Sequence, residues 1–308
     1  MRLHLCFLIG SLGLLGGCET SPRRQPKLDS LPQADETQKT LYERAIALFQ
    51  VGGEEFETVL REGRGDPVLA KALTMFLVFH MRDAEQRQRQ RQSGNFEMRG
   101  LRDNVRYAQA RAGLGILGGA ALPTVQAELI QNRHTENRLF GVVALTALGA
   151  EAVPAIRDAM RVSEPRYRRY YVDAVSQMRP SKKAELQLLR WSKDQDFSVR
   201  SKALAGLTRY GDRHLALLRG VLRTDPDPFV RRQIVQNLGD HKDLATVTSV
   251  IDYYGRCSGD GDDRGCREAE RTLVRMSGMK SKSRGQAIKS YGLPYWRKWA
   301  ESLPKEGR

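Results

Sequence analysis

Cysteine is scarce in this chain of 308 residues, which contains only Cys6, Cys18, Cys257 and Cys266. No two cysteines are spaced as C-x-x-C and no two histidines as H-x-x-x-H, so neither a zinc ribbon nor a helical zinc site is expected. The G-x-S-x-G elbow of serine hydrolases is absent as well. The sequence therefore predicts no cofactor and gives no support to an enzyme.

Long apolar runs are also missing beyond the N-terminus, so we expect no membrane-spanning helix there. The apolar stretch at residues 5–15 follows the positive Arg2 and is too short to cross a bilayer. It ends in Leu15-Gly16-Gly17-Cys18, which resembles the lipobox of bacterial lipoproteins. The resemblance implies a signal peptide at residues 1–17, cleavage before Cys18 and a diacylglycerol on its sulfur. An ordinary secretory signal or a short anchor is the alternative, and it leaves the position of Cys18 unexplained.

Acyl chains on Cys18 would hold the mature chain on the periplasmic face of the cell envelope. Glu19 is not the aspartate that marks inner-membrane retention in the enteric lipoprotein rule, so the outer membrane is favoured over the inner. Cys6 leaves with the signal peptide and Cys18 carries the lipid. The remaining pair, Cys257 and Cys266, is predicted to form a disulfide in that oxidising compartment.

The segment between these two cysteines is rich in aspartate and glycine. We expect an inserted surface loop that the disulfide stabilises by about 2–3 kcal/mol. Asp260, Asp262 and Asp263 offer oxygen ligands, so a calcium site is the weaker alternative. The EF-hand pattern, with its longer loop and terminal glutamate, is missing.

Negative charge is in the minority, because 51 lysines and arginines face 36 acidic residues and give a formal net charge of +15. In a cytosolic protein this excess would suggest nucleic acid as a partner. Export makes nucleic acid an unlikely partner and favours acidic proteins, lipid headgroups, lipopolysaccharide or cell-wall polymers. A well-solvated surface with no specific anionic partner is the alternative.

A periodic pattern organises most of the chain. Apolar anchor residues recur at intervals of 31, 30, 32, 31 and 35, at Leu114, Leu145, Val175, Leu207, Leu238 and Leu273. A basic residue precedes four of these anchors by seven positions, at Arg138, Arg168, Arg200 and Arg231. Two apolar helices per unit at such a period predict a solenoid.

The repeats resemble HEAT repeats of the short bacterial kind. Residues 196–204 and 227–235 are similar to the D-x-x-V-R-x-x-A start of that family's first helix. The resemblance implies an all-α fold, a right-handed α-solenoid of helical hairpins with helical end caps. The unit at residues 166–191 departs most, since Tyr167, Tyr170 and Tyr171 crowd its first helix.

Five segments follow along the chain. A signal peptide occupies residues 1–17, and a flexible tether carrying Cys18 covers 18–38. Two helices, the second opening at Asp66, form an N-terminal cap over 39–98. The repeats span 99–278, and a C-terminal helical cap with Trp296 and Trp299 covers 279–308.

Solenoids expose long surfaces that bind partners, so we predict a membrane-anchored, non-catalytic protein-binding scaffold that is itself monomeric. In HEAT proteins the second helices line the inner surface. Basic residues expected there form the predicted binding site for an acidic protein: Arg157, Arg161, Lys183, Arg190, Arg219 and Arg223. The alternatives are an anionic polymer or nucleic acid on this groove, and a HEAT-like lyase. The G-x-G-x-x-G at residues 113–118 lies in a helical segment and is not a dinucleotide loop.

Overall fold

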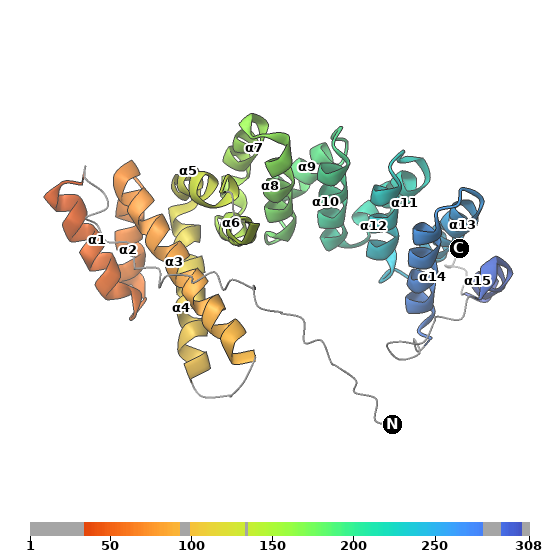
Figure 1. The fold of residues 1–308 in the computed structure, drawn as a ribbon, viewed down its shortest axis with the longest axis horizontal. Helices are drawn as coiled ribbons and strands as arrows, with labels where there is room; N and C mark the ends of the chain where they lie inside the picture. The colour runs from red at the N-terminus through yellow and green to blue at the C-terminus, as the bar shows by residue number, and fades with distance from the viewer. Residues whose placement is uncertain (1–33, 93–98, 133–134, 280–290, 304–308) are drawn as a thin grey trace, which may run out of the picture.

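The computed structural model describes residues 34–92, 99–132, 135–279 and 291–303. Within these ranges the chain is helical and contains no β-strand. The helices stack side by side into an elongated array with α1 (Glu36–Phe49) at one end and α15 (Gly292–Glu301) at the other, as Figure 1 shows. The all-α solenoid predicted from the repeat pattern is confirmed. The signal peptide, Cys18 and most of the tether lie outside the described residues.

The N-terminal end is built from α1, α2 (Glu54–Gly63) and α3 (Pro67–Gln92). Helix α1 begins inside the predicted tether because Asp35 and Gln38 form a reciprocal capping box. Helix α2 was not predicted, and it is separated from α1 by two glycines with positive φ, Gly52 and Gly53. The predicted start of the next helix is confirmed, because the Asp66 carboxylate accepts hydrogen bonds from the Val68 and Leu69 amides.

Two layers of helices form the repeats. The first helices of successive units make one layer: α4 (Arg99–Leu117), α6 (Thr135–Ala147), α8 (Pro165–Gln177), α10 (Phe197–Leu207), α12 (Pro228–Leu238) and α14 (Asp263–Ser277). The second helices make the other layer: α5 (Leu122–Val125), α7 (Val153–Val162), α9 (Lys182–Trp191), α11 (Leu215–Thr224) and α13 (Leu244–Gly259). Helix α5 continues as a π-helical turn over Gln126–Ile130, and α15 packs on α13.

The six periodic anchor residues all lie in the first-helix layer and are at most 1% exposed. They belong to a single apolar core that runs through the whole array and ends on Trp296, which is fully buried. No hairpin closes a core of its own, so each one is stabilised by its two neighbours. Trp296 has the core position predicted for it, and its ring centroid lies 5.6 Å from that of Trp299.

One helical stretch among the described residues, Val105–Ile130, is long and apolar enough to cross a membrane, and a bent pair over residues 137–162 passes the same test. The apolar window of Val105–Ile130 is 56% buried inside the array. Gly118 interrupts it with a φ of +53°. Both stretches contribute repeat helices to the shared core.

Arginines of the first-helix layer connect successive units. The Arg200 guanidinium donates two hydrogen bonds, of 2.9 and 3.0 Å, to the Asp225 carboxylate of the following unit. It also donates to the Asp194 and Gln195 carbonyls of its own unit. Arg231, one repeat later, donates to the carbonyls of Asp225 and Pro226. The basic residue found by periodicity therefore fixes the loops between units in register.

The third unit breaks this pattern at Arg168. Its Nε atom is buried and has no hydrogen-bond partner among the described residues. In the preceding loop the Ser163 hydroxyl lies 3.1 Å from the Tyr171 hydroxyl and donates to it. Tyr167, Tyr170 and Tyr171 are all buried, so aromatic packing replaces the arginine contacts here.

We predict that Asp225→Ala lowers the free energy of unfolding by about 2–4 kcal/mol, because the buried Arg200 guanidinium loses its carboxylate. The Asp225 side chain is only 5% exposed. Urea denaturation measures the change. Asp158→Ala, which removes an exposed partner of Arg157, should cost less than about 0.5 kcal/mol. Equal losses in the two variants would contradict the role of the Arg200–Asp225 pair.

Candidate functional site: a basic cleft on the second helices

The second-helix layer carries all six residues predicted to bind a partner. Arg157 and Arg161 lie on α7, and Lys183 and Arg190 on α9; all four are exposed. Arg157 is paired with the neighbouring Asp158, and Lys183 with Glu151. No ion pair involves Arg161 or Arg190 among the described residues. These four side chains form an open basic surface and not an enclosed site.

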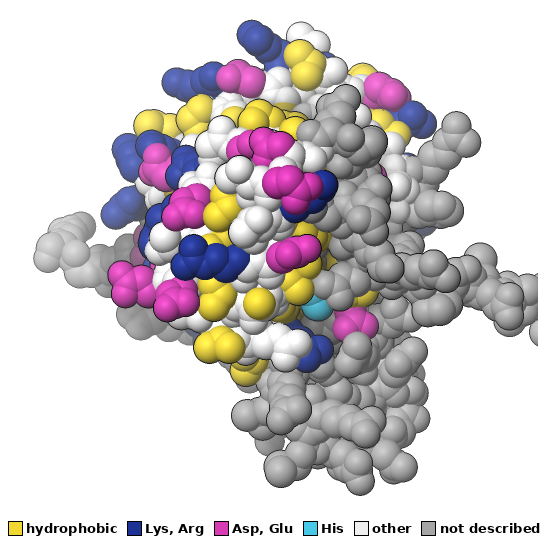
Figure 2. Space-filling model, turned by 90° about the vertical axis from the view of Figure 1, so that its left-hand side faces the viewer, with side chains coloured by type: hydrophobic (Ala, Val, Ile, Leu, Met, Phe, Trp, Pro, Cys, Tyr) yellow, Lys and Arg dark blue, Asp and Glu magenta, His cyan; other side chains and the backbone are white. Residues whose placement is uncertain are grey.

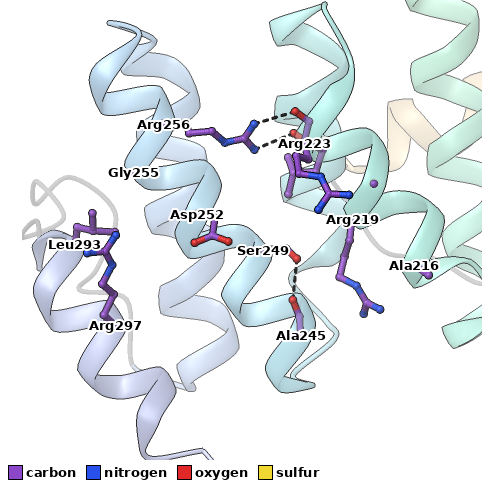
Figure 3. A pocket seen from close by; sticks show the side chains of 12 residues that line it. Ala216, Arg219, Arg223, Ala245, Ser249, Asp252, Gly255, Arg256, Leu293 and Arg297 are labelled. Atoms are coloured by element: carbon purple, nitrogen blue, oxygen red, sulfur yellow. Dashed lines mark hydrogen bonds between the residues drawn. The ribbon is translucent and has the colours of Figure 1, made fainter.

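The other two predicted residues, Arg219 and Arg223, line a cleft of about 690 Å³. This volume is within the range of ligand-binding clefts. Helices α11, α13 and α15 form its walls (Figure 3). The lining includes two arginines that sequence reasoning missed, Arg256 and Arg297. The remaining lining residues are mostly small: Ala216, Gly220, Leu222, Ala245, Ser249, Asp252, Gly255 and Leu293.

Two of the cleft arginines are held in place by the scaffold. Arg219 donates to the Asp243 carboxylate at 3.2 Å and to the Thr246 hydroxyl at 3.1 Å. Arg256 donates to the Leu222 and Arg223 carbonyls at the end of α11. A guanidinium has five N–H donors, so both retain donors for a ligand. Because they are already ordered, binding to them avoids part of the entropy cost, about 0.5–1.5 kcal/mol per long side chain.

The other charged groups of the cleft are not engaged. Arg223, Arg297 and Asp252 make no hydrogen bond or ion pair through their side chains among the described residues. Asp252 lies on α13 between Arg297 on one side and Arg219 and Arg223 on the other (Figure 3). Four arginines and one aspartate leave the lining strongly positive, which suits a ligand that is anionic and also brings a hydrogen-bond donor.

Positive charge is not spread evenly over the molecule. Helices α1 and α2 together contain six glutamates against three basic residues. Figure 2, which faces the end of the array where these helices lie, shows acidic and basic side chains interspersed. The cleft at the opposite end contains arginines in excess. The positive charge is therefore distributed unevenly along the array, with an acidic excess at the α1 end and a basic excess in the cleft.

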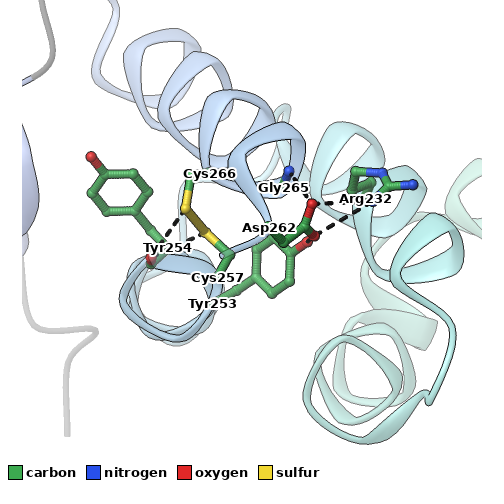
Figure 4. The surroundings of a disulfide bond; sticks show 7 residues. All are labelled: Arg232, Tyr253, Tyr254, Cys257, Asp262, Gly265 and Cys266. Atoms are coloured by element: carbon green, nitrogen blue, oxygen red, sulfur yellow. Dashed lines mark hydrogen bonds and ion pairs between the residues drawn. A yellow bond between two sulfur atoms is a disulfide. The ribbon is translucent and has the colours of Figure 1, made fainter. Parts of the chain in front are cut away.

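The two cysteines lie at the junction of α13 and α14, as Figure 4 shows. Their sulfurs are at disulfide-bonding distance, and their Cα atoms are 5.5 Å apart. The predicted inserted loop is wrong, because Cys257 and Cys266 both lie inside helices and only residues 260–262 connect these helices. The longer last repeat interval comes from α13, which has 16 residues where α11 has 10.

Asp262 stabilises this junction. Its carboxylate caps α14 through the Gly265 amide at 2.9 Å, pairs with Arg232 at 3.2 Å, and accepts from the Tyr253 hydroxyl. Burial raises the pKa of the Asp262 carboxyl, but the Gly265 amide and the Arg232 guanidinium outweigh burial and hold this pKa below its ordinary value. Asp260 and Asp263 are exposed. In the described part of the chain the three aspartates do not form a metal-binding group.

One buried carboxylate contacts a histidine. The Glu185 Oε1 of α9 lies 3.0 Å from the His214 Nε2 before α11, and Lys182 also approaches this carboxylate. Burial raises the pKa of the Glu185 carboxyl, but hydrogen bonds from His214 and Lys182 outweigh it, so the pKa is lowered. The pair does not line the cleft and links two successive second helices.

A sequence model of HEAT repeats matches residues 186–273, from within α9 to within α14. The matched region contains the Arg200–Asp225 contact and two of the three cleft walls. Residues 186–273 are therefore HEAT repeats, as the first-helix motifs at 196–204 and 227–235 indicated. No curated protein matches the chain.

We predict that Glu185→Gln changes how stability depends on pH. A carboxyl whose pKa is lowered by folding stabilises the fold fully above its unfolded value, 4.5, and this stabilisation disappears as the pH falls through the folded value. The variant should lose about 1–3 kcal/mol at neutral pH and show a shallower decline in acid. Urea denaturation from pH 3 to pH 7 measures both effects, with the exposed Glu128→Gln as control. Parallel curves for wild type and Glu185→Gln would refute this assignment.

Proposed function

We propose that this chain is a lipid-anchored scaffold of the bacterial cell envelope that holds an acidic protein partner on the face formed by its second helices. HEAT repeats in general mediate protein–protein contacts. The observation that carries the acidic partner is the basic cleft of Arg219, Arg223, Arg256 and Arg297. The lipobox at Cys18 supports the anchor and the location, with the outer membrane favoured.

The elongated shape of the array supports a function that depends on the distance between its two ends. The described part of the chain enters the array at α1, whereas the cleft is at the α15 end (Figure 1). A scaffold of this shape separates a partner bound in the cleft from the first described helix by the length of the array. The additional cations on α7 and α9 would steer an acidic partner toward the array, since surface charge raises association rates more than it raises affinity.

Binding of an anionic polymer or of nucleic acid by the same face is the second candidate. Its support is the positive charge alone. Asp252 stands inside the cleft and requires a hydrogen-bond donor from the ligand, which a peptide backbone supplies at every residue, so we favour a protein. A lyase activity has no support from the described residues, whose buried Glu185–His214 pair does not line the cleft.

The anchor is tested directly with Cys18→Ser. We expect the variant to lose incorporation of labelled palmitate and to leave the membrane fraction, because the thiol that would carry the lipid is gone. A variant with Cys6→Ser, which alters only the predicted signal peptide, should remain in the membrane fraction. Membrane retention of Cys18→Ser would remove the basis for an acylated terminus.

Partner capture is tested by cross-linking in intact cells followed by mass spectrometry. Reversal of Arg157, Arg161, Arg219 and Arg223 to Glu should abolish the main cross-linked partner, because repulsion replaces attraction across the whole face. A matched control reverses four exposed cations of the first-helix layer: Lys202, Arg264, Arg267 and Arg271. Capture that survives the first set, or fails equally with the control set, would contradict the proposed face.

A further inference from the structure

Gly220 lies in the middle of α11 with no packing reason to be glycine. A Cβ atom built on it would meet nothing within 4 Å. Glycine in a helix interior is unfavourable relative to alanine or leucine, because it loses more backbone entropy on folding. Its φ is not in the left-handed region either. Neither backbone conformation nor neighbouring atoms therefore account for this residue.

Several other glycines inside the described repeat helices are explained by close contacts, whereas Gly259, like Gly220, meets nothing within 4 Å but lies at the last residue of α13. At Gly206 an added Cβ would lie 2.6 Å from the Cβ of Ser176, and at Gly141 it would lie 2.5 Å from the Cδ1 of Ile130. Gly255, across the cleft, leaves room for Leu293 of α15 at 3.3 Å. Gly220 differs because the space beside it is the empty cleft.

We infer that this cleft is a specific seat for an acidic peptide segment of the partner, with Gly220 as the contact that lets the peptide lie close to α11. This inference rests on the proposed scaffold function and assigns it to one site. The cleft is about 690 Å³ in volume, enough for several side chains and not for a whole folded surface. The small side chains of Ala216 on α11 and Ala245 on α13 leave space for the peptide along these two walls of the cleft.

The charged groups define what the peptide must contain. Arg223 and Arg297 stand on opposite walls and bind carboxylates of the segment, while Arg219 and Arg256 contribute their remaining N–H groups from fixed positions. Asp252 lies between them and accepts from a backbone amide or an amine of the peptide. The phosphodiester backbone of DNA offers no such donor, so the same aspartate favours a peptide backbone over a DNA backbone in this cleft.

The test measures binding of fluorescein-labelled hexaglutamate, with labelled oligothymidylate as the polyanion for comparison, by fluorescence anisotropy. Wild-type protein should bind hexaglutamate in preference. Gly220→Leu fills the cleft without changing any charge, and should weaken peptide binding about tenfold or more. Its midpoint of thermal unfolding should not fall, because leucine is a better helix former. The double reversal Arg223→Glu with Arg297→Glu should weaken binding to a similar extent.

Two further variants separate the cleft from general electrostatics. Arg267→Glu changes an exposed arginine of α14 and should alter binding of hexaglutamate less than about twofold. Asp252→Asn should strengthen oligothymidylate binding more than peptide binding. Unchanged hexaglutamate binding by a folded Gly220→Leu protein would overturn the inference. Stronger wild-type binding of oligothymidylate would overturn it in favour of nucleic acid.

Cross-linking in cells distinguishes a failure of this inference from a failure of the scaffold function. If Gly220→Leu keeps the partner and reversal of Arg157, Arg161 and Arg190 loses it, the scaffold function stands and the cleft is the wrong site. If none of these variants changes capture, the proposed function fails at its first step, because the partner is not held on the basic second-helix face. Loss of the partner with Gly220→Leu supports both.

Discussion

Burial that is shared between neighbours is the constraint on which this structure depends. Each hairpin has one apolar face toward the unit before it and another toward the unit after it, so its stability belongs to the stack. Apolar contacts alone tolerate small slides, because they have little directionality. The paired hydrogen bonds from Arg200 to Asp225 add direction, and they fix the height of one unit against the next. A fixed register keeps the second helices evenly placed, so side chains of three different helices meet in one cleft.

Several units of the array form the cleft together, and no single repeat contains all of its lining residues. Arg219 and Arg223 come from one unit, Asp252 and Arg256 from the next, and Arg297 from the C-terminal cap. The scaffold orders two of the arginines through Asp243 and through the carbonyl end of α11, which also neutralises part of the helix dipole there. Arg256 therefore serves the stability of the scaffold and also lines the cleft, since it both binds the carbonyl end of α11 and faces the cavity.

Periodicity predicted the fold well because the shared core demands the same residue type at the same place in every unit. The anchors from Leu114 to Leu273 could be read directly for that reason, and all are buried. Features outside the repeat were less predictable. Helix α2 has a short apolar face after two glycines, and α13 extends to residue 259, although the predicted loop began at Cys257. Arg256 was missed because it directly precedes that predicted loop. Arg297 was missed because α15 was treated only as a cap, and its packing on α13 is a tertiary contact without a sequence signal.

Gly220 lowers the stability of α11 and keeps the cleft open, so stability and the proposed binding make opposite demands at this position. A screen for thermal tolerance would select alanine or leucine at this position early, because the substitution improves the helix and disturbs no neighbour. A larger side chain at this position would narrow the cleft between α11 and α13. Heat-tolerant variants selected in this way would then be expected to last longer and, under the proposed function, to bind a partner less tightly.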